Sequence, residues 1–438
     1  MPPRRTARRG AVPSVAGHAA RLLAASALGI ALAASPARAA ETATGPEAPP
    51  APLSPESGPT DEQLRIEAAF RLGLIAITAG DYEAAAVIFD DILDHDPDLV
   101  RVRLELARAL YLSGEHDDRA RFQFERLLSA DLPEAVKANI EKFLDAIRLR
   151  RRWSLGLTVA IVPDSNITGG PESREVNLGG LPFYLNDSST RKSGVGVLTG
   201  VFGGYRFDLG ERWRIKAEGG LNQRSYEDSD FDDTVASFSV GPRLLLSRGE
   251  VGVSFDGYYR WYGLDPYAVS TGVRVDGQYL LSRRLRAEAS GRVALLDSLT
   301  GDGREGRTYD SSFTLRYAVR PSLLIYGSAN AYRESLEANH LSSKSVGVAT
   351  GVYGDLPWGF SAGASYRYSE AAYDGVQPLF GVDRDDTVWQ ASATLLNRKI
   401  NFWKITPQFR YTHVSNQSNI SIYEYDRDIF QIGFTKEF

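Results

Sequence analysis

The 438-residue sequence contains no cysteine, few histidines and no long apolar run. Without cysteine the chain can form no disulfide, bind no metal through thiolates and carry no lipid on an N-terminal cysteine. The five histidines are scattered, and no pair of them has the spacing of a metal site. No segment approaches about 18 uninterrupted apolar residues, so we expect no transmembrane helix. We also expect no cofactor, no bound metal and no enzyme chemistry.

The first 39 residues have the pattern of an export signal. A basic region of four arginines at positions 4, 5, 8 and 9 comes before an apolar stretch at 22–34, and an Ala-x-Ala site at 37–39 predicts cleavage after Ala39. Residues 40–60 are rich in Pro, Ala, Glu and Ser, which predicts a disordered linker. Residues 1–39 hold six arginines and no acid, so the remainder has 44 basic and 55 acidic residues. This excess of acid argues against nucleic acid as a partner.

A helical pattern occurs twice within residues 61–149. Gly80 and Gly114 are 34 residues apart, and small, aromatic and proline residues follow both at similar offsets. This period predicts two to three tetratricopeptide-like repeats, with residues 134–149 as a capping helix. The signature residues are Gly80, Tyr82, Ala85, Phe89, Pro97, Gly114, Ala120 and Phe124. Such repeats commonly present a concave peptide-binding surface; a helical plug or spacer is the alternative.

The last residues of the chain alternate between apolar and polar side chains. The apolar members are Phe430, Ile432, Phe434 and the terminal Phe438. This period-2 pattern predicts a strand that closes a transmembrane β-barrel and serves as its C-terminal insertion signal, with the final aromatic in the girdle at the bilayer edge.

Residues 150–438 contain fourteen such alternating segments. The connections after even-numbered segments are short, and those after odd-numbered segments, including 262–268, are mostly longer and polar. Short turns on one side and long loops on the other are typical of outer-membrane barrels. The fold class predicted is therefore α+β multidomain: N-terminal helical repeats in the periplasm, then a 14-stranded antiparallel transmembrane β-barrel in the outer membrane of a Gram-negative cell.

The polar parity of these strands would line a lumen. Its basic members are Arg214, Lys216, Arg286, Arg292, Arg316, Arg367, Lys404 and Arg410. They are candidates for a route taken by a polar cargo. The alternative is ordinary solvation of a water-filled interior.

The order of signal peptide, helical repeats and fourteen-strand barrel resembles the surface lipoprotein assembly modifier family, called Slam. The first strand runs into VPDSNI at 162–167, and Asp164, Ser165 and Asn166 match a segment that opens the barrel domain of that family. The resemblance covers residues 61–438 and implies an outer-membrane translocator. Slam proteins deliver particular lipoproteins, and some soluble haem- or metal-scavenging proteins, to the cell surface.

The resemblance implies a client lipoprotein or secreted protein as partner, received by the repeats and passed outward by the barrel. Outer-membrane lipid, periplasmic chaperones and the barrel assembly machinery are further expected partners. Three alternatives remain: a porin-like solute channel, a polysaccharide exporter with an accessory periplasmic domain, and a structural barrel that tethers an envelope complex. A porin needs no peptide-binding repeats, and exporters usually carry far longer repeat arrays than the roughly three repeats this chain can hold.

Overall fold

The structure is a computed structural model that describes residues 60–150, 152–178, 181–186, 189–397, 400 and 405–436. The predicted signal peptide, nearly all of the predicted linker, Lys404 and Phe438 lie outside these residues. The chain divides into two units, residues 1–65 and 66–438. The described part of the first unit opens a helix with a capping box. In this box Thr60 N donates to Gln63 Oε1 at 2.9 Å, and Gln63 N donates to Thr60 Oγ1 at 3.3 Å.

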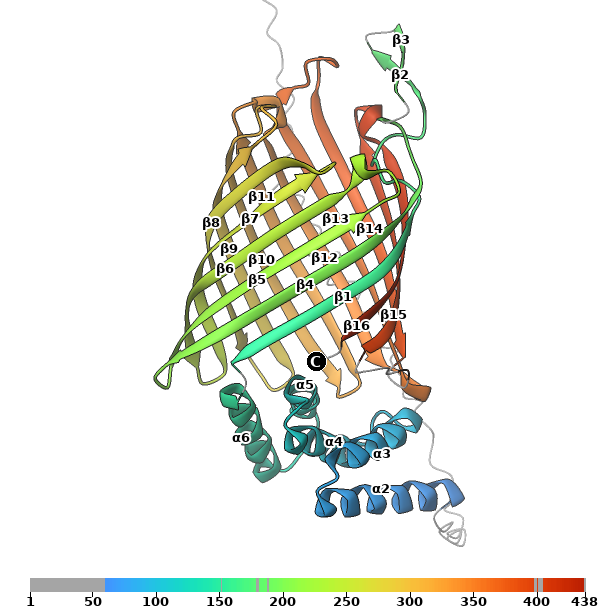
Figure 1. Ribbon diagram of the computed structural model, residues 1–438, viewed down its shortest axis with the longest axis vertical. Coiled ribbons are helices and arrows are strands. Elements are labelled where there is room, and N and C mark those ends of the chain that lie inside the picture. Colours follow the sequence, from blue (N-terminus) through green and yellow to red (C-terminus); the bar gives the residue numbers. More distant parts are fainter. Residues whose placement is uncertain are drawn as a thin grey trace, which may run out of the picture. The chain divides into compact units, whose positions relative to one another are not determined.

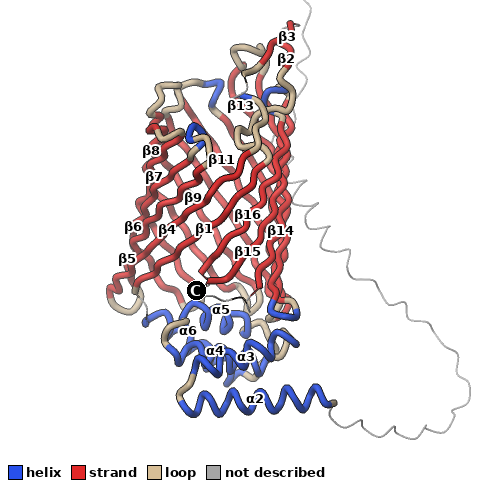
Figure 2. Tube along the Cα trace, turned by 45° about the vertical axis from the view of Figure 1, so that its right-hand side comes forward, coloured by secondary structure: helices blue, strands red, loops and turns tan. Residues whose placement is uncertain are grey.

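The helical region contains five helices within the described residues. They are α2 (Asp61–Ala79), α3 (Tyr82–His95), α4 (Val100–Ser113), α5 (Asp117–Leu127) and α6 (Glu134–Arg150). Figure 2 shows them as separate blue segments joined by short loops. Two helices end at the glycines of the predicted repeat signature. Gly80 and Gly114 have φ of 83° and 72°, a left-handed backbone conformation that is costly for any residue with a side chain. None of the described helices has the length and apolar character needed to cross a membrane.

The strands after residue 150 form a closed antiparallel barrel of fourteen strands, so the predicted fold class is confirmed (Figure 1). They are β1 (Trp153–Asp164), β4 (Gly194–Leu209), β5 (Trp213–Ser225), β6 (Asp233–Leu246), β7 (Gly249–Tyr262), β8 (Asp265–Leu280), β9 (Leu285–Ser298), β10 (Gly306–Arg320), β11 (Leu323–Leu336), β12 (Ser343–Asp355), β13 (Phe360–Val376), β14 (Asp383–Asn397), β15 (Ile405–Ser418) and β16 (Tyr425–Lys436). Each strand pairs with its neighbour in sequence, and β1 closes the barrel against β16.

The connections at one end of the barrel are short throughout the described residues. Three of them, at 210–212, 247–248 and 321–322, contain two or three residues, and we call this end the short-turn end. Most connections at the opposite, long-loop end are longer. The first of these carries a separate hairpin of β2 (Glu175–Leu178) and β3 (Leu181–Tyr184), which projects beyond the barrel in Figure 1.

One predicted long loop, 262–268, is wrong. The chain turns there in two residues, Gly263 and Leu264, with φ of 59° and 69°. Positive φ at both central positions suits the twist of a tight hairpin, and it allows Tyr262 to pair directly with Asp265. The aromatic rings of Tyr262 and Tyr267 then pack 5.9 Å apart, so residues expected in a loop extend both strands instead.

The alternation along each strand separates an apolar outer face from a polar inner face. On β1 the apolar side chain of Leu155 is 53% exposed, whereas Ala160, of the opposite parity, is 2% exposed. Trp153, Trp213 and Trp358 are also exposed, and all three lie near the short-turn end. Large exposed apolar side chains would be costly in water and are favourable in a bilayer, with tryptophans at its edge.

Candidate functional site

The predicted repeat signature lies inside the helical region. Ala85, Phe89, Ala120 and Phe124 are fully buried. Phe89 packs beside Phe70 at a ring distance of 5.7 Å, and Phe124 stacks on Phe143 at 5.1 Å. These residues hold the helices together and leave none of their own surface for a ligand.

The remaining signature positions shape the loops between helices. Asp81 follows Gly80 and caps α3 by accepting a hydrogen bond from Ala84 N at 3.1 Å. Tyr82 is half-buried against the core. The carbonyl of Pro97 accepts a hydrogen bond from Arg103 Nη2 at 2.6 Å, which ties the loop after α3 to helix α4.

A buried carboxylate joins the helical region to the barrel. Asp355 ends β12, and its Oδ2 lies 3.3 Å from Arg103 Nη2 and 2.8 Å from Arg126 Nη1. Ser361 donates a hydrogen bond to the other oxygen of Asp355 at 2.9 Å. The Arg126 side chain also donates to the carbonyl of Pro321 in the turn before β11. Helices α4 and α5 are therefore anchored on two turns of the short-turn end.

Further polar contacts extend this interface along the rim. Glu125 of α5 pairs with Arg286 of β9 at 3.0 Å, and Arg284 Nε donates to the carbonyl of Ser129 at 2.8 Å. Asp98 pairs with Arg320 at 2.8 Å. These contacts place the helices on the turns between β8 and β13, along one arc of the short-turn end.

An exposed pair at the start of α6 completes this arc. Arg283 donates two hydrogen bonds to the Glu134 carboxylate, one of them at 2.7 Å. The Arg283 guanidinium holds the pKa of Glu134 below its ordinary value, and the carboxylate in turn raises the pKa of Arg283. Both shifts favour the charged pair, although water and salt screen it at this exposed site.

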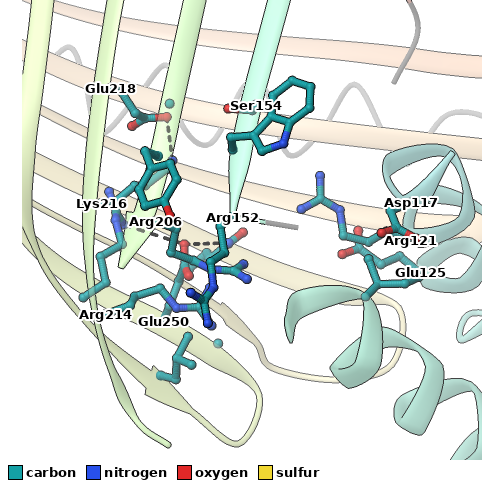
Figure 3. Close-up of a pocket in the computed structure, with 18 of the residues that line it drawn as sticks. Asp117, Arg121, Glu125, Arg152, Ser154, Arg206, Arg214, Lys216, Glu218 and Glu250 are labelled. Carbon is teal, nitrogen blue, oxygen red and sulfur yellow. Dashed lines mark hydrogen bonds and ion pairs between the residues drawn. The ribbon is translucent and has the colours of Figure 1, made fainter. Parts of the chain in front are cut away.

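Between helix α5 and the barrel wall lies a cavity of about 330 Å³, which we call the entrance cavity. Its charged lining comprises Asp117, Arg121 and Glu125 of α5, and Arg152, Arg206, Arg214, Lys216, Glu218, Arg243, Arg248, Glu250 and Arg286 of the barrel side. Figure 3 shows side chains from the strands and from the helix on opposite sides of this space. Eight basic and four acidic side chains line it, although the whole chain has a net charge of −5.

Three arginines of the entrance cavity share one carboxylate. Asp208 lies 3.2 Å from Arg206 Nε, 3.8 Å from Arg152 Nε and 4.0 Å from Arg214 Nε. The side chains of Arg206 and Arg214 are only 15% and 8% exposed. Positive charge is thus concentrated in a site where water screens it poorly.

The structure brings only some of the predicted lumen residues together. Arg214, Lys216 and Arg286 line the entrance cavity. The others with described positions lie elsewhere along the barrel, where Arg292 pairs with Asp256 at 2.8 Å and Arg316 with Glu288 at 2.8 Å. Arg410 donates to Thr394 Oγ1 at 3.3 Å, and Arg367 lies opposite Gln390 on β14.

Sequence reasoning missed Arg152, Arg206 and Asp208. Two of them could have been predicted from strand alternation, because Arg206 and Asp208 have the same parity as the polar positions of β4. The residues that helix α5 adds to the cavity lining could not be predicted in this way, because no local sequence pattern shows which strands a helix will face.

The segment Asp164-Ser165-Asn166 lies where β1 meets β16. The side chain of Asp164 is fully buried, and its oxygens accept hydrogen bonds from Arg427 Nε at 2.9 Å and Nη2 at 2.5 Å. Asn166 N also donates to Asp164 Oδ1 at 3.0 Å. This two-pronged ion pair joins the first and last strands of the barrel.

Backbone contacts of the same segment strengthen that seam. Ser165 N donates to the carbonyl of Asp428 at 3.0 Å, and Asp428 N donates to Ser165 Oγ at 2.8 Å. Asn166 Nδ2 donates to the carbonyl of Gly170 at 2.9 Å. Asn166 Nδ2 also donates to the carbonyl of Asp426 on β16 at 3.3 Å, so the segment fastens the long-loop end of the seam.

The apolar residues of the last strand face outward. Phe430, Ile432 and Phe434 are all exposed on the barrel. Phe430 packs against Tyr411 of β15 at a ring distance of 4.9 Å. This outward placement is the one that a lipid-facing closing strand requires.

One group of possible metal ligands could not be found from the spacing of histidines, because it contains only one histidine and two glutamates. Glu83, Glu115 and His116 bring their ligand atoms within 4.8 Å of one another. His116 Nε2 lies 3.0 Å from Glu83 Oε1, so this contact links α3 to the start of α5. Both glutamates are exposed, and the described contact is a side-chain link between the two repeats.

Comparison with protein families gives two matches. A family model described as "Surface lipoprotein assembly modifier" matches residues 153–438, and a tetratricopeptide repeat model matches residues 76–138. The first spans the barrel and the second most of the helical region.

Named relatives match over most of the chain. Surface lipoprotein assembly modifier 1 of Neisseria meningitidis is 23% identical, over 86% of this chain and 77% of that protein. The hemophilin secretion modulator of Acinetobacter baumannii is 22% identical, over 82% of this chain and 76% of that protein. Among solved structures, OmpF of Salmonella typhi covers 65% of this chain and 97% of its own at 9% identity, with a TM-score of 0.40.

Proposed function

The chain belongs to the surface lipoprotein assembly modifier family, and we propose that it delivers a specific lipoprotein or secreted protein to the cell surface. The protein lies in the outer membrane, as its family and its closed barrel with an apolar outer face require. Its helical repeats lie in the periplasm, receive the client and present it to the short-turn end. The barrel then passes the client outward along its polar inner face.

The observation that carries this proposal is the anchoring of the repeats on the barrel. Asp355 is buried between Arg103 and Arg126, two arginines of different helices. A carboxylate so placed holds the helices on the rim, because leaving either partner charge buried alone is costly. A client bound by the repeats would therefore already lie beside the barrel. A passive solute channel has no use for such an arrangement.

The proposal includes no catalytic step. The repeats would bind the client, and the barrel would shield it from the lipid as it passes outward. The energy for this step would come from the client or from other components. Outer-membrane lipid would surround the barrel. Periplasmic chaperones would deliver the unfolded chain to the outer membrane, and the barrel assembly machinery would fold it there. The porin-like channel and the polysaccharide exporter are the competing functions.

The test compares cells with and without the gene. Candidate clients are lipidated or secreted proteins encoded beside it, each detected by surface proteolysis of intact cells. Uptake of small solutes is measured in the same cultures. A variant with Phe89→Ala and Phe124→Ala, which empties the repeat core, tests the helical region separately.

A client cleaved in wild-type cells and protected in the deletion strain is the expected result. The repeat-core variant should protect the client as well, with the barrel still present in the membrane. Unchanged surface exposure of every candidate, together with altered solute uptake, would replace this proposal with the channel function.

A further inference from the structure

Arg206 of β4 has a hydrogen-bonding group that the described residues leave unused. Its side chain is largely buried, and Nη2 has no hydrogen-bond partner there. The Nε atom lies 3.2 Å from Asp208 Oδ1, an ion pair whose geometry gives no hydrogen bond. A buried guanidinium N–H without an acceptor is costly, so an oxyanion entering the cavity would gain a strong partner.

The surroundings of Arg206 show which oxyanion suits the site. Asp208 already places a carboxylate between Arg206, Arg152 and Arg214. Three guanidinium groups meet at this carboxylate, and Arg206 Nη2 keeps a donor that no described residue uses. The carboxylate of a ligand could accept hydrogen bonds from the same guanidinium groups that surround Asp208.

The position of the site determines where the ligand comes from. Arg206 lines the cavity on the inner face of β4, whereas Phe207 next to it has the opposite parity and is 52% exposed on the outer face. A lipid headgroup at the outer surface is thus separated from Arg206 by the strand. The ligand must reach the cavity from the barrel interior or from the helices.

The mixture of charges favours a peptide over a compact phosphate. Helix α5 contributes Asp117, Arg121 and Glu125 to the same lining, opposite the arginines of the wall (Figure 3). A small dianion gains nothing from the acidic groups. An extended chain can place its own charges against both signs along a cavity of about 330 Å³, which has room for a few side chains.

We propose that the entrance cavity binds carboxylate side chains of an extended acidic segment of the client, with Arg206 and Arg214 as the main contacts. This inference rests on the proposed function and specifies how the client is recognised. The segment would contact α5 and the barrel wall together, at the point where it passes from the repeats to the barrel.

The test uses the purified full chain in detergent and fluorescence anisotropy. The probes are a fluorescein-labelled peptide of alternating Glu and Gly, its Gln–Gly counterpart, and inorganic phosphate as competitor. We expect the Glu–Gly peptide to bind with an affinity that falls with salt. The double variant Arg206→Gln/Arg214→Gln should weaken binding about tenfold or more. The matched control is Arg304→Gln/Arg307→Gln, which also removes two positive charges, at the long-loop end of the barrel.

Folding of each variant is checked by the heat-dependent mobility of the barrel on gels. If the double variant fails to fold, Arg206→Gln alone takes its place. The charge-reversed Arg206→Glu/Arg214→Glu provides a second test, because it should bind a Lys–Gly peptide in preference to the Glu–Gly peptide. Equal binding of the Gln–Gly peptide, unchanged affinity in the folded variants, or stronger binding of phosphate than of peptide would overturn the inference.

Surface display of the client separates this inference from the proposed function. Display lost on gene deletion but complete in Arg206→Gln/Arg214→Gln would overturn the role of the cavity and leave the function intact. Display unaffected by deletion, with peptide binding as expected, would overturn the function and leave an acidic-peptide site.

Discussion

Asp355 Oδ2 lies 3.3 Å from Arg103 Nη2, although the two residues are 252 positions apart in the sequence. Their side chains are 2% and 1% exposed. One residue ends a barrel strand and the other lies in the middle of helix α4. This pair links the region that would receive a client to the region that would pass it outward.

The substitution Asp355→Asn should loosen the helices from the barrel. It leaves two arginines without the anion they share, and breaking a buried ion pair in this way costs about 3–5 kcal/mol. Urea unfolding of the helical region in the full chain, followed by far-UV circular dichroism, should therefore shift to lower urea. Asp302→Asn in a long loop serves as control and should leave the transition in place. Coincident transitions for wild type and Asp355→Asn would show that this pair does not anchor the helices.

The substitution Gly73→Ala should destabilise the first repeat. A Cβ at this position would lie 2.5 Å from the Phe89 ring, and overpacking of this kind costs about 1–3 kcal/mol. Alanine also improves helix propensity by about 1 kcal/mol, so the net loss should be about 2 kcal/mol or less. Thermal melting of the helical signal measures it. Phe89→Leu in the same chain should recover part of the loss, and failure to do so would mean that the ring is not the obstacle.

The substitution Asp164→Ala should weaken the seam between β1 and β16. It leaves Arg427 without the carboxylate that accepts three of its hydrogen bonds, at a cost of about 3–5 kcal/mol. The temperature at which the unboiled barrel loses its compact mobility on a gel should fall. Asp164→Ala/Arg427→Met removes both charges and should recover most of that temperature. A direct client contact at Asp164 would instead impair display without changing barrel stability.

The stability that the Glu134–Arg283 contact contributes should decrease at low pH. Because the folded pKa of Glu134 is lowered, the contact contributes stability above the unfolded carboxyl pKa of about 4.3 and loses it as the pH falls through the lowered value. The raised pKa of Arg283 keeps that partner charged throughout. An NMR titration of labelled glutamate carboxyls, assigned with Glu134→Gln, should give a lower midpoint in wild type than in Arg283→Gln. Identical midpoints would contradict the pairing.

Much of this architecture could be predicted from the sequence because it depends on local periodicity. Side chains two apart share a face, so the outward placement of Phe430 and Ile432 follows from the alternation alone. The 34-residue spacing of Gly80 and Gly114 likewise predicted the breaks between helices.

The parts that could not be predicted depend on long-range placement or on small changes of turn. Asp355 carries no local sign that it will meet Arg103, because only the docking of helices on the rim brings them together. The tight turn at Gly263 and Leu264 requires positive φ at a leucine, which the sequence does not favour. Asp164 matched a family segment, yet sequence alone gave no reason to place its carboxylate against Arg427.

The central claim is that the client passes outward along the polar inner wall of the barrel, and two adjacent residues test it most directly. Gln278 and Tyr279 of β8 both border the entrance cavity, but their side chains point to opposite faces of the strand. Gln278 Nε2 donates to Glu250 Oε1 in the cavity lining, whereas the Tyr279 side chain has the outward parity and is 41% exposed. A photo-crosslinking amino acid is placed at either position in cells that export the client, with purification through a tag on the client. Client adducts at position 278 and none at 279 are the predicted result. Adducts at 279 alone, or at neither position while the client still reaches the surface, would contradict the account.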